Sequence, residues 1–317
     1  MRIDVHAHLW SEAYLDLLER FGRTSTGAQR RSGAGPGDAE MQARLALMDR
    51  AGVEMQILSS PPQAPHFEDA ARALEAARRI NDQYAETVDR WPRRFKAFAS
   101  LPLPHVEPSL AELRRALDEL GMVGVAITTA ILGRSIADPA FAPIYQELDR
   151  RGSVLFIHPE GCGCHSPLIQ KHNMTWMVGA PIEDTVAVMH LIAYGILSRY
   201  PNLKIINSHL GGAIPMLLQR LDHQYRFEAP DAPEKPSDAA KRMWYDTVGH
   251  NHRPALRAAV ESFGADRLVL GTDFPFLRGE VFQGAIDYIA DAGLDPEAAR
   301  RIRDVNAARL LGLFDKA

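Results

Sequence analysis

Residues 153–158 read Ser-Val-Leu-Phe-Ile-His, a short apolar run that ends at His158. Two other stretches have the same form, because residues 203–209 end at His209 and residues 267–273 end at Asp273. The chain itself begins with a related stretch, Asp4-Val5-His6-Ala7-His8. Such apolar runs are typical of buried parallel strands, and the C-terminal strand ends form the active-site face of a (β/α)₈ barrel. The four stretches therefore predict strands that bring polar side chains to one site.

The rest of the chain alternates between strand-like and helix-like segments. Strands are expected at 2–5, 54–58, 95–101, 123–127, 154–158, 205–209, 243–247 and 268–273. Helices are expected at 39–51, 67–91, 108–120, 139–151, 182–200, 213–226, 254–263 and 281–292, with a final helix at 304–313 packed outside. This pattern predicts an α/β fold, a single (β/α)₈ TIM-like barrel domain over residues 1–317 with a C-terminal helix. Loops at 24–37 and 159–179 are expected at the barrel mouth.

Composition limits the classes of partner. The chain has 36 Lys and Arg against 40 Asp and Glu, a net charge of −4, so no basic excess points to nucleic acid. No apolar stretch is long enough for a membrane span, and the N-terminus lacks a signal-peptide pattern. The two cysteines, Cys162 and Cys164, are too few for a disulfide framework. We therefore expect a cytoplasmic protein that acts on a small molecule.

The pair His6 and His8 indicates a metal site. Side chains at i and i+2 on a strand point the same way, so both imidazoles can bind one ion. His158 and Asp273 would complete the ligand set, and three imidazoles with one carboxylate suit Zn²⁺ or a similar divalent metal. The alternative is that these are ordinary core or surface histidines, which is a weaker explanation for the whole set than for His6 and His8 alone.

The 159–179 loop and two aromatic residues are candidates for the pocket. Cys162, Cys164 and His165 look like metal ligands, but a lone Cys-x-Cys lacks the second pair of a structural zinc site. We interpret them as loop residues near the pocket. Trp176 and Phe276 are expected to form an apolar wall for a planar substrate, although aromatic residues are more often simply core.

Several motifs together resemble the amidohydrolase superfamily, in the branch typified by 2-amino-3-carboxymuconate-6-semialdehyde decarboxylase. They are Asp4-Val5-His6-Ala7-His8, Ile157-His158-Pro159, His209-Leu210-Gly211-Gly212 and Gly271-Thr272-Asp273-Phe274-Pro275. The resemblance implies a metal bound by His6, His8, His158 and Asp273, with His209 as the acid/base beside a metal-bound water and Asp273 also counted as catalytic. A histidine at position 6 matches the zinc-type pattern, so Zn²⁺ is expected, with Mn²⁺ as the alternative and no organic cofactor. Glu160 departs from the family, in which Trp follows His-Pro at this position.

The resemblance also assigns two arginines. Arg44 matches a position that binds the substrate carboxylate, and Arg220 matches one that enters the site of a neighbouring subunit, which implies a homodimer. Guanidinium groups recognise carboxylates by two parallel hydrogen bonds. The alternative for each residue is an arginine that is solvated or paired on a helix surface.

The expected reaction is a metal-dependent, non-oxidative decarboxylation of an unsaturated or aromatic carboxylic acid. The metal would lower the pKa of its bound water to about 7, and His209 would exchange protons with it. The main alternative is a hydrolase of a lactone, amide or ester at the same site. A noncatalytic small-molecule binder is a third hypothesis, but a binder does not need an acid/base beside a metal.

Overall fold

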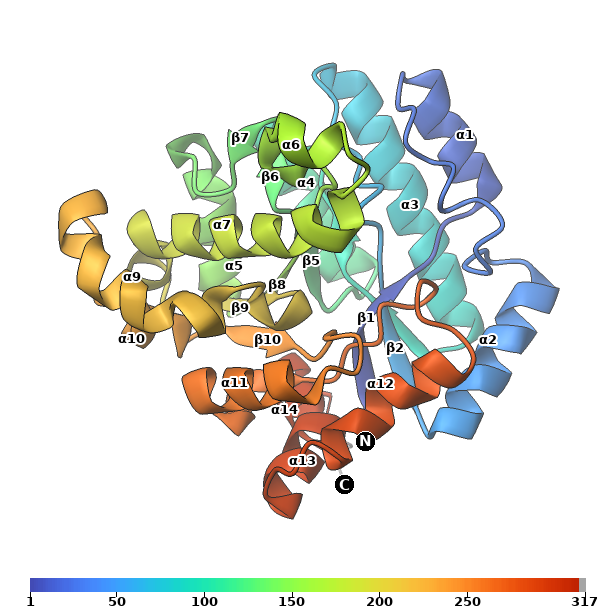
Figure 1. Ribbon diagram of the computed structural model, residues 1–317. Helices are drawn as coiled ribbons and strands as arrows, with labels where there is room; N and C mark the ends of the chain where they lie inside the picture. The colour runs from blue at the N-terminus through green and yellow to red at the C-terminus, as the bar shows by residue number, and fades with distance from the viewer. Residues whose placement is uncertain (314–317) are drawn as a thin grey trace.

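The computed structural model describes residues 1–313, which form an α/β fold whose parallel strands are surrounded by helices (Figure 1). One sheet has the order β1-β2-β3, a second has the order β11-β10-β9-β8-β5-β4, and β6 and β7 form an antiparallel hairpin. The strands are β1 (Ile3–His8), β2 (Met55–Ser59), β3 (Phe95–Ala97), β4 (Ala99–Ser100), β5 (Gly124–Thr128), β6 (Ala130–Ile131), β7 (Arg134–Ser135), β8 (Val154–His158), β9 (Lys204–Asn207), β10 (Trp244–Asp246) and β11 (Leu268–Val269).

Fourteen α-helices are assigned in the described part of the chain. They are α1 (Glu12–Arg20), α2 (Asp38–Ala51), α3 (Ala70–Arg90), α4 (Val106–Arg114), α5 (Ala142–Arg151), α6 (Pro167–Gln170), α7 (Ala180–Ala193), α8 (Ile196–Arg199), α9 (Ile214–Glu228), α10 (Pro236–Ala240), α11 (Arg253–Phe263), α12 (Glu280–Ala290), α13 (Pro296–Asp304) and α14 (Asn306–Leu311). Across residues 1–313, none of them combines the length and apolar character that a bilayer crossing requires.

Capping residues account for several helix ends. The Asp69 side chain accepts a hydrogen bond from the Arg72 amide, so α3 starts at residue 70 and not at 67 as predicted. Asp138 caps the short 3₁₀ segment before α5, with its carboxylate 2.9 Å from the Ala140 amide nitrogen. The predicted helix at 182–200 is wrong as a single element, because Gly195 has a φ of 63° and separates α7 from α8.

The two sheets are connected by backbone hydrogen bonds at both sides. β3 and β4 follow each other directly, and the Phe98 amide donates to the Leu58 carbonyl while the Val123 amide donates to the Ala97 carbonyl. On the other side, the Val5 amide donates to the Leu270 carbonyl at 2.9 Å. β1 therefore lies beside the segment that follows β11, although these segments are distant in sequence.

Alternate strand residues separate two apolar clusters. On β8, Val154 and Phe156 pack in a cluster of strand residues, whereas Leu155 and Ile157 pack in the larger cluster that includes helix residues. The side-chain period of two then places His158 on the same side as Phe156. The cluster of strand residues therefore lies directly beneath the polar side chains at the strand ends.

The C-terminal helix differs from the prediction in its form and its place. α14 lies within the range 304–313 that was predicted as a helix, whereas α13 precedes it in a segment where no helix was predicted. α14 does not simply pack outside. Ala307, Ala308 and Leu310 join the cluster of strand residues that contains Val5 and Phe156. The Asn306 side chain fixes this position by donating hydrogen bonds to the carbonyls of Ala265 and Leu268. Burial of the apolar face of α14 explains why the helix covers the strands.

Candidate active site

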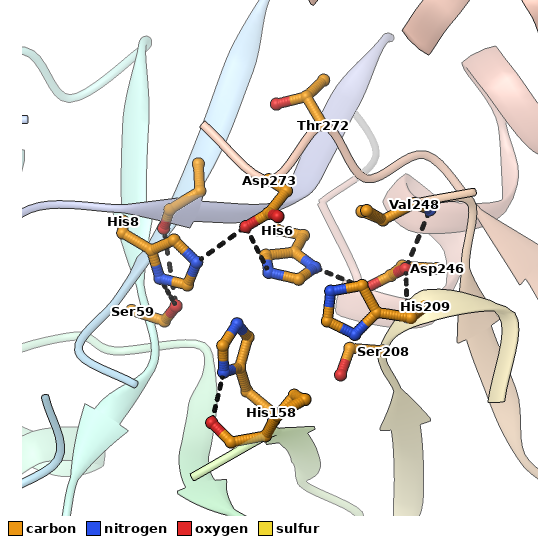
Figure 2. Close-up of polar contacts among 12 residues, drawn as sticks. His6, His8, Ser59, His158, Ser208, His209, Asp246, Val248, Thr272 and Asp273 are labelled. Carbon is orange, nitrogen blue, oxygen red and sulfur yellow. Dashed lines mark hydrogen bonds and ion pairs between the residues drawn. The ribbon is translucent and has the colours of Figure 1, made fainter. Parts of the chain in front are cut away.

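The four side chains predicted to bind a metal come together at the carboxyl ends of the strands (Figure 2). His6 and His8 lie on β1, His158 ends β8, and Asp273 follows β11 in a turn where its φ is 58°. One potential ligand atom of each residue lies within 4.8 Å of the others. The Oδ1 atom of Asp273 is 3.2 Å from Nε2 of His6 and 3.3 Å from Nε2 of His8. The structure therefore assembles a compact, buried N₃O donor set.

Each of the three imidazoles is oriented through its Nδ1 atom. His6 donates from Nδ1 to Oδ2 of Asp246 at 2.7 Å, and His158 donates from Nδ1 to the Pro159 carbonyl at 2.9 Å. Nδ1 of His8 lies 3.2 Å from the Ser59 hydroxyl. These contacts leave the lone pair of each imidazole on Nε2, the atom that faces the shared centre. This arrangement is typical of metal-binding histidines.

The electrostatics of the donor set favour a cation. Burial alone would lower the pKa of His6, but the carboxylates of Asp246 and Asp273 outweigh it and raise that pKa to about 10. The carboxylates thus favour a positive charge at the His6 ring. Nε2 of His6 is also buried without a hydrogen bond of acceptable geometry, despite its proximity to Asp273. A divalent metal would supply both the charge and the missing contact, so the donor set fits a metal ion.

His209 lies beside this donor set. The predicted strand at 205–209 ends earlier, at Asn207, and His209 begins a short 3₁₀ turn with a φ of 50°. Its ring centroid is 5.3 Å from that of His6 and 5.7 Å from that of His158. Nδ1 donates to Oδ2 of Asp184 at 2.9 Å, and the backbone amide donates to Oδ1 of Asp246. The ring is therefore held with Nε2 available for proton transfer.

The Asp184 carboxylate changes the protonation of His209. Burial lowers the pKa of His209, but the charge and hydrogen bond of Asp184 outweigh that effect and raise the pKa above its ordinary value. His209 consequently favours the protonated form more than a free imidazole does. This property suits a group that delivers a proton near neutral pH.

A cavity of about 870 Å³ opens in front of these groups. Its walls are mostly apolar, and the lining includes Trp176, Met177, Leu210, Met216, Val248 and Phe276. The polar side chains of the lining in residues 1–313 are His158, His209, His250 and Asp273, with no lysine or arginine among them. The two predicted aromatic residues, Trp176 and Phe276, therefore lie at the cavity and are 51% and 43% exposed. The cavity suits an apolar molecule that presents a polar group to the histidines.

The chain matches a known protein family over almost its full length. The amidohydrolase family model matches residues 3–313. The chain belongs to the amidohydrolase family.

Relatives within this family share nearly the full chain. A 2-amino-3-carboxymuconate-6-semialdehyde decarboxylase from Dictyostelium discoideum is 30% identical over 90% of this chain and 85% of its own length. A gamma-resorcylate decarboxylase from Rhizobium radiobacter is 32% identical over 85% of this chain and 86% of its own. The crystal structure of a dihydroxybenzoic acid decarboxylase from a Polaromonas species, with bound manganese and 2-nitroresorcinol, superposes with a TM-score of 0.84 at 26% identity, covering 98% of this chain and 97% of that chain. This chain thus lies in the decarboxylase branch of the amidohydrolases.

The structure does not bring Arg44 to the cavity, contrary to its expected contact with substrate. Its side chain is buried, 2% exposed, and donates from Nη1 to the His8 carbonyl and from Nε to Oε1 of Gln56. The guanidinium also stacks over the rings of Phe95 and Phe274. Arg44 therefore supports β1 from behind the metal-binding histidines.

Arg220 is also absent from the cavity lining in residues 1–313. It lies on α9 with an exposed side chain, and α9 extends to the edge of the molecule (Figure 1). An arginine there cannot act in its own site. Its assigned action on a neighbouring subunit requires a second copy of the chain.

Two acidic residues of the site were missed in the sequence. Asp246 accepts hydrogen bonds from Nδ1 of His6 and from the amides of His209 and Val248, so it links the donor set to His209 (Figure 2). Asp246 is the last residue of β10, so the strand-end pattern that identified His158 could also have identified Asp246. Asp184 lies inside α7, where nothing in the local sequence distinguishes it from a solvated helix carboxylate.

Proposed function

We propose that this chain is a metal-dependent, non-oxidative decarboxylase of unsaturated or aromatic carboxylic acids. The observation that carries the proposal is the convergence of three Nε2 atoms and the Asp273 carboxylate beside His209, at the base of an apolar cavity. The family relationship supports it, since the relatives described above are named as decarboxylases. The reaction replaces the carboxylate of the substrate by hydrogen and releases CO₂.

The proposed metal ligands are His6, His8, His158 and Asp273. Zn²⁺ is the first choice for an N₃O donor set, and Mn²⁺ is the alternative because the Polaromonas relative binds manganese. When bound, the metal supplies a fixed positive charge that attracts the substrate carboxylate and stabilises negative charge as it develops. The amidohydrolase chain supplies the remaining chemistry through its own side chains.

The apolar cavity is proposed to orient the substrate. With the carboxylate directed toward the donor set, the planar part of the acid would lie between Trp176 and Phe276. Exclusion of water by these walls strengthens the electrostatic interactions within the site. Positioning of this kind can lower a barrier by several kcal/mol, on the order of the gains seen in oriented reactions.

His209 is proposed to transfer the proton. Its Nε2–H would protonate the carbon that bears the carboxylate, and the electrons of the breaking C–C bond would then restore the conjugated system as CO₂ leaves. Asp184 holds the ring by accepting a hydrogen bond from Nδ1 and stabilises the charged form of His209. The proton is returned from solvent at the end of the cycle, so the reaction consumes one proton and forms one CO₂.

We further propose a single closed barrel and a homodimer. The backbone hydrogen bonds between β1 and residues 270–274 support closure, because they connect the first strand to the segment after the last. The exposed Met216 and Phe227 on α9 support a dimer in which Arg220 reaches the neighbouring site. Unpaired Cys162 and Cys164 support a cytoplasmic setting.

CO₂ release measures the proposed function directly. Metal-depleted protein is reloaded with Zn²⁺ or Mn²⁺ and incubated with hydroxybenzoates, methylsalicylates and carboxymuconate semialdehydes. We expect CO₂ from at least one acid with the loaded protein and none with His209→Ala. Hydrolysis of lactones, amides or esters without any CO₂ release would instead support the hydrolase.

A further inference from the structure

A second group of donor side chains lies in the loop between β8 and α7. One atom each of Glu160, Cys162 and His165 lies within 4.8 Å of the others, outside the donor set of the active site. The loop also contains α6, and it lies beside the β6–β7 hairpin (Figure 1). The group combines a carboxylate, a thiol and an imidazole, which are the three ligand types that zinc prefers in proteins.

The buried carboxylate of Glu183 holds this loop in shape. It accepts backbone hydrogen bonds from Glu160 at 2.8 Å, from Gly161 at 3.1 Å and from Gly163 at 2.6 Å. The Thr129 hydroxyl donates to it as well, at 2.9 Å. These bonds fix the backbone from which the three donor side chains extend, so the donors are arranged before any ion binds.

The loop backbone adopts an unusual conformation at the donors. Cys164 and His165 have φ values of 52° and 56°, in a region that side chains other than glycine rarely occupy. Gly163, between the two cysteines, has a φ of 55°. Without this succession of left-handed residues the chain would carry His165 away from Cys162. Conformations of this kind cluster at ligand-binding segments.

One donor atom of the group is unsatisfied. Oε2 of Glu160 is buried without a hydrogen-bond partner among the described residues. A cation bound at the group would contact this oxygen, which otherwise stays buried without a partner.

We propose that Glu160, Cys162 and His165 bind one Zn²⁺ ion, at a site separate from the catalytic metal. Glu160 and His165 supply the two further donors that Cys162 alone lacks. On binding, the S–H bond of Cys162 breaks, an Sγ–Zn bond forms, and the proton leaves to solvent while the metal stays divalent. A water would complete a tetrahedral shell.

The second site adjoins a wall of the cavity. A Cβ atom placed on Gly161 would lie 2.9 Å from two ring atoms of Trp176, so the backbone between two of the donors packs against that ring. Zn²⁺ bound to Glu160 and Cys162 would therefore restrain Trp176 where it lines the cavity. The ion has a structural role in the proposal and takes no part in the reaction.

Metal stoichiometry and a spectroscopic signature test the proposal. Protein stripped with a chelator is titrated with Zn²⁺ and, separately, with Co²⁺, which reports thiolate ligation by a charge-transfer absorption. We expect the wild type to bind two equivalents of metal per chain and, with Co²⁺, to show a thiolate-to-cobalt absorption band. His8→Ala, which changes β1 and not the loop, should lose one equivalent and keep the band.

Matched loop variants identify the ligands. Cys162→Ser and His165→Gln should each lose one equivalent and the thiolate band, whereas the control Cys164→Ser should keep both. His165 is exposed, so its substitution leaves the core intact, and near-UV circular dichroism checks the fold of every variant. A single equivalent in the wild type, or a band that survives Cys162→Ser, would overturn the proposal.

Discussion

The Nδ1 atom of His209 lies 2.9 Å from Oδ2 of Asp184, and both side chains are largely buried, with 15% and 1% exposure. The contact joins a residue after β9 to a residue inside α7. It fixes the tautomer of His209, directs Nε2 toward the active site and raises the pKa of the imidazole. The pair therefore determines both the direction and the proton affinity of the proposed acid.

Asp184→Asn should slow decarboxylation and move the pH profile. Without the carboxylate the pKa of His209 falls, so the limb of the kcat/KM profile that His209 controls should shift to lower pH. We expect a loss of about 10²-fold or more in kcat, because a general acid contributes roughly that factor. The measurement is CO₂ release from pH 5 to 9 (roughly the range in which imidazoles titrate). An unchanged profile would contradict the assignment, and Asp291→Asn on the surface serves as control.

Asp246→Asn should weaken metal binding. Asp246 accepts the Nδ1 proton of His6, so its loss removes the contact that orients the ring and makes Nε2 a stronger electron-pair donor to the metal. Affinity for the catalytic metal should fall by about 10- to 100-fold, as measured by competition with a chromophoric chelator. Asp184→Asn provides the comparison, because it contacts His209 and none of the proposed ligands. If both variants lost the metal equally, Asp246 would have no specific role in metal binding that Asp184 lacks.

Trp176→Ala and Phe276→Ala should raise KM more than they lower kcat. Each ring lines the cavity, so truncation removes apolar contact with the planar substrate. An increase of about tenfold in KM corresponds to roughly 1.4 kcal/mol of lost binding. Tyr194→Ala, at the end of α7 and outside the cavity lining, should leave KM unchanged in the same assay. If KM of all three variants matched the wild type, the substrate would not bind between these rings.

Arg44→Met should destabilise the fold rather than weaken substrate binding. The substitution keeps the apolar stem but leaves the His8 carbonyl and Gln56 without their buried donors. We expect a loss of about 2–4 kcal/mol in the free energy of unfolding. KM of the folded protein at low temperature should stay near the wild-type value. A large rise in KM with unchanged stability would restore the carboxylate-binding role that the family resemblance implies.

The sequence predicted the strand-end residues well because their signal is local. An apolar run that stops at His158 or Asp273 marks both a strand and its functional end, and the HxH pair adds the strand period of two. The helix break at Gly195 and the place of α14 were harder to predict from the sequence. A break in an apolar helix depends on one left-handed residue, and the place of α14 depends on which apolar surface remains uncovered after the strands assemble.

Roles that depend on distant contacts could not be predicted from one segment. Asp184 acquires its role only when α7 is placed beside the residues that follow β9. For Arg44 the sequence alone was insufficient in another way. The residues around it resemble a substrate-binding motif, but Gln56 and the His8 carbonyl hold its guanidinium behind β1. The match of a residue to a motif does not fix the direction in which its side chain points.

The lack of lysine and arginine side chains in the cavity lining of residues 1–313 has a consequence for the order in which metal and substrate bind. A carboxylate that leaves water for apolar walls gains no compensating charge from those walls. Within one subunit its counter-charges would be the metal proposed at His6, His8, His158 and Asp273 and the protonated ring of His209. Binding should therefore be sequential, with the metal first and the substrate second. The metal-free protein should not bind even an acid whose shape fits the cavity.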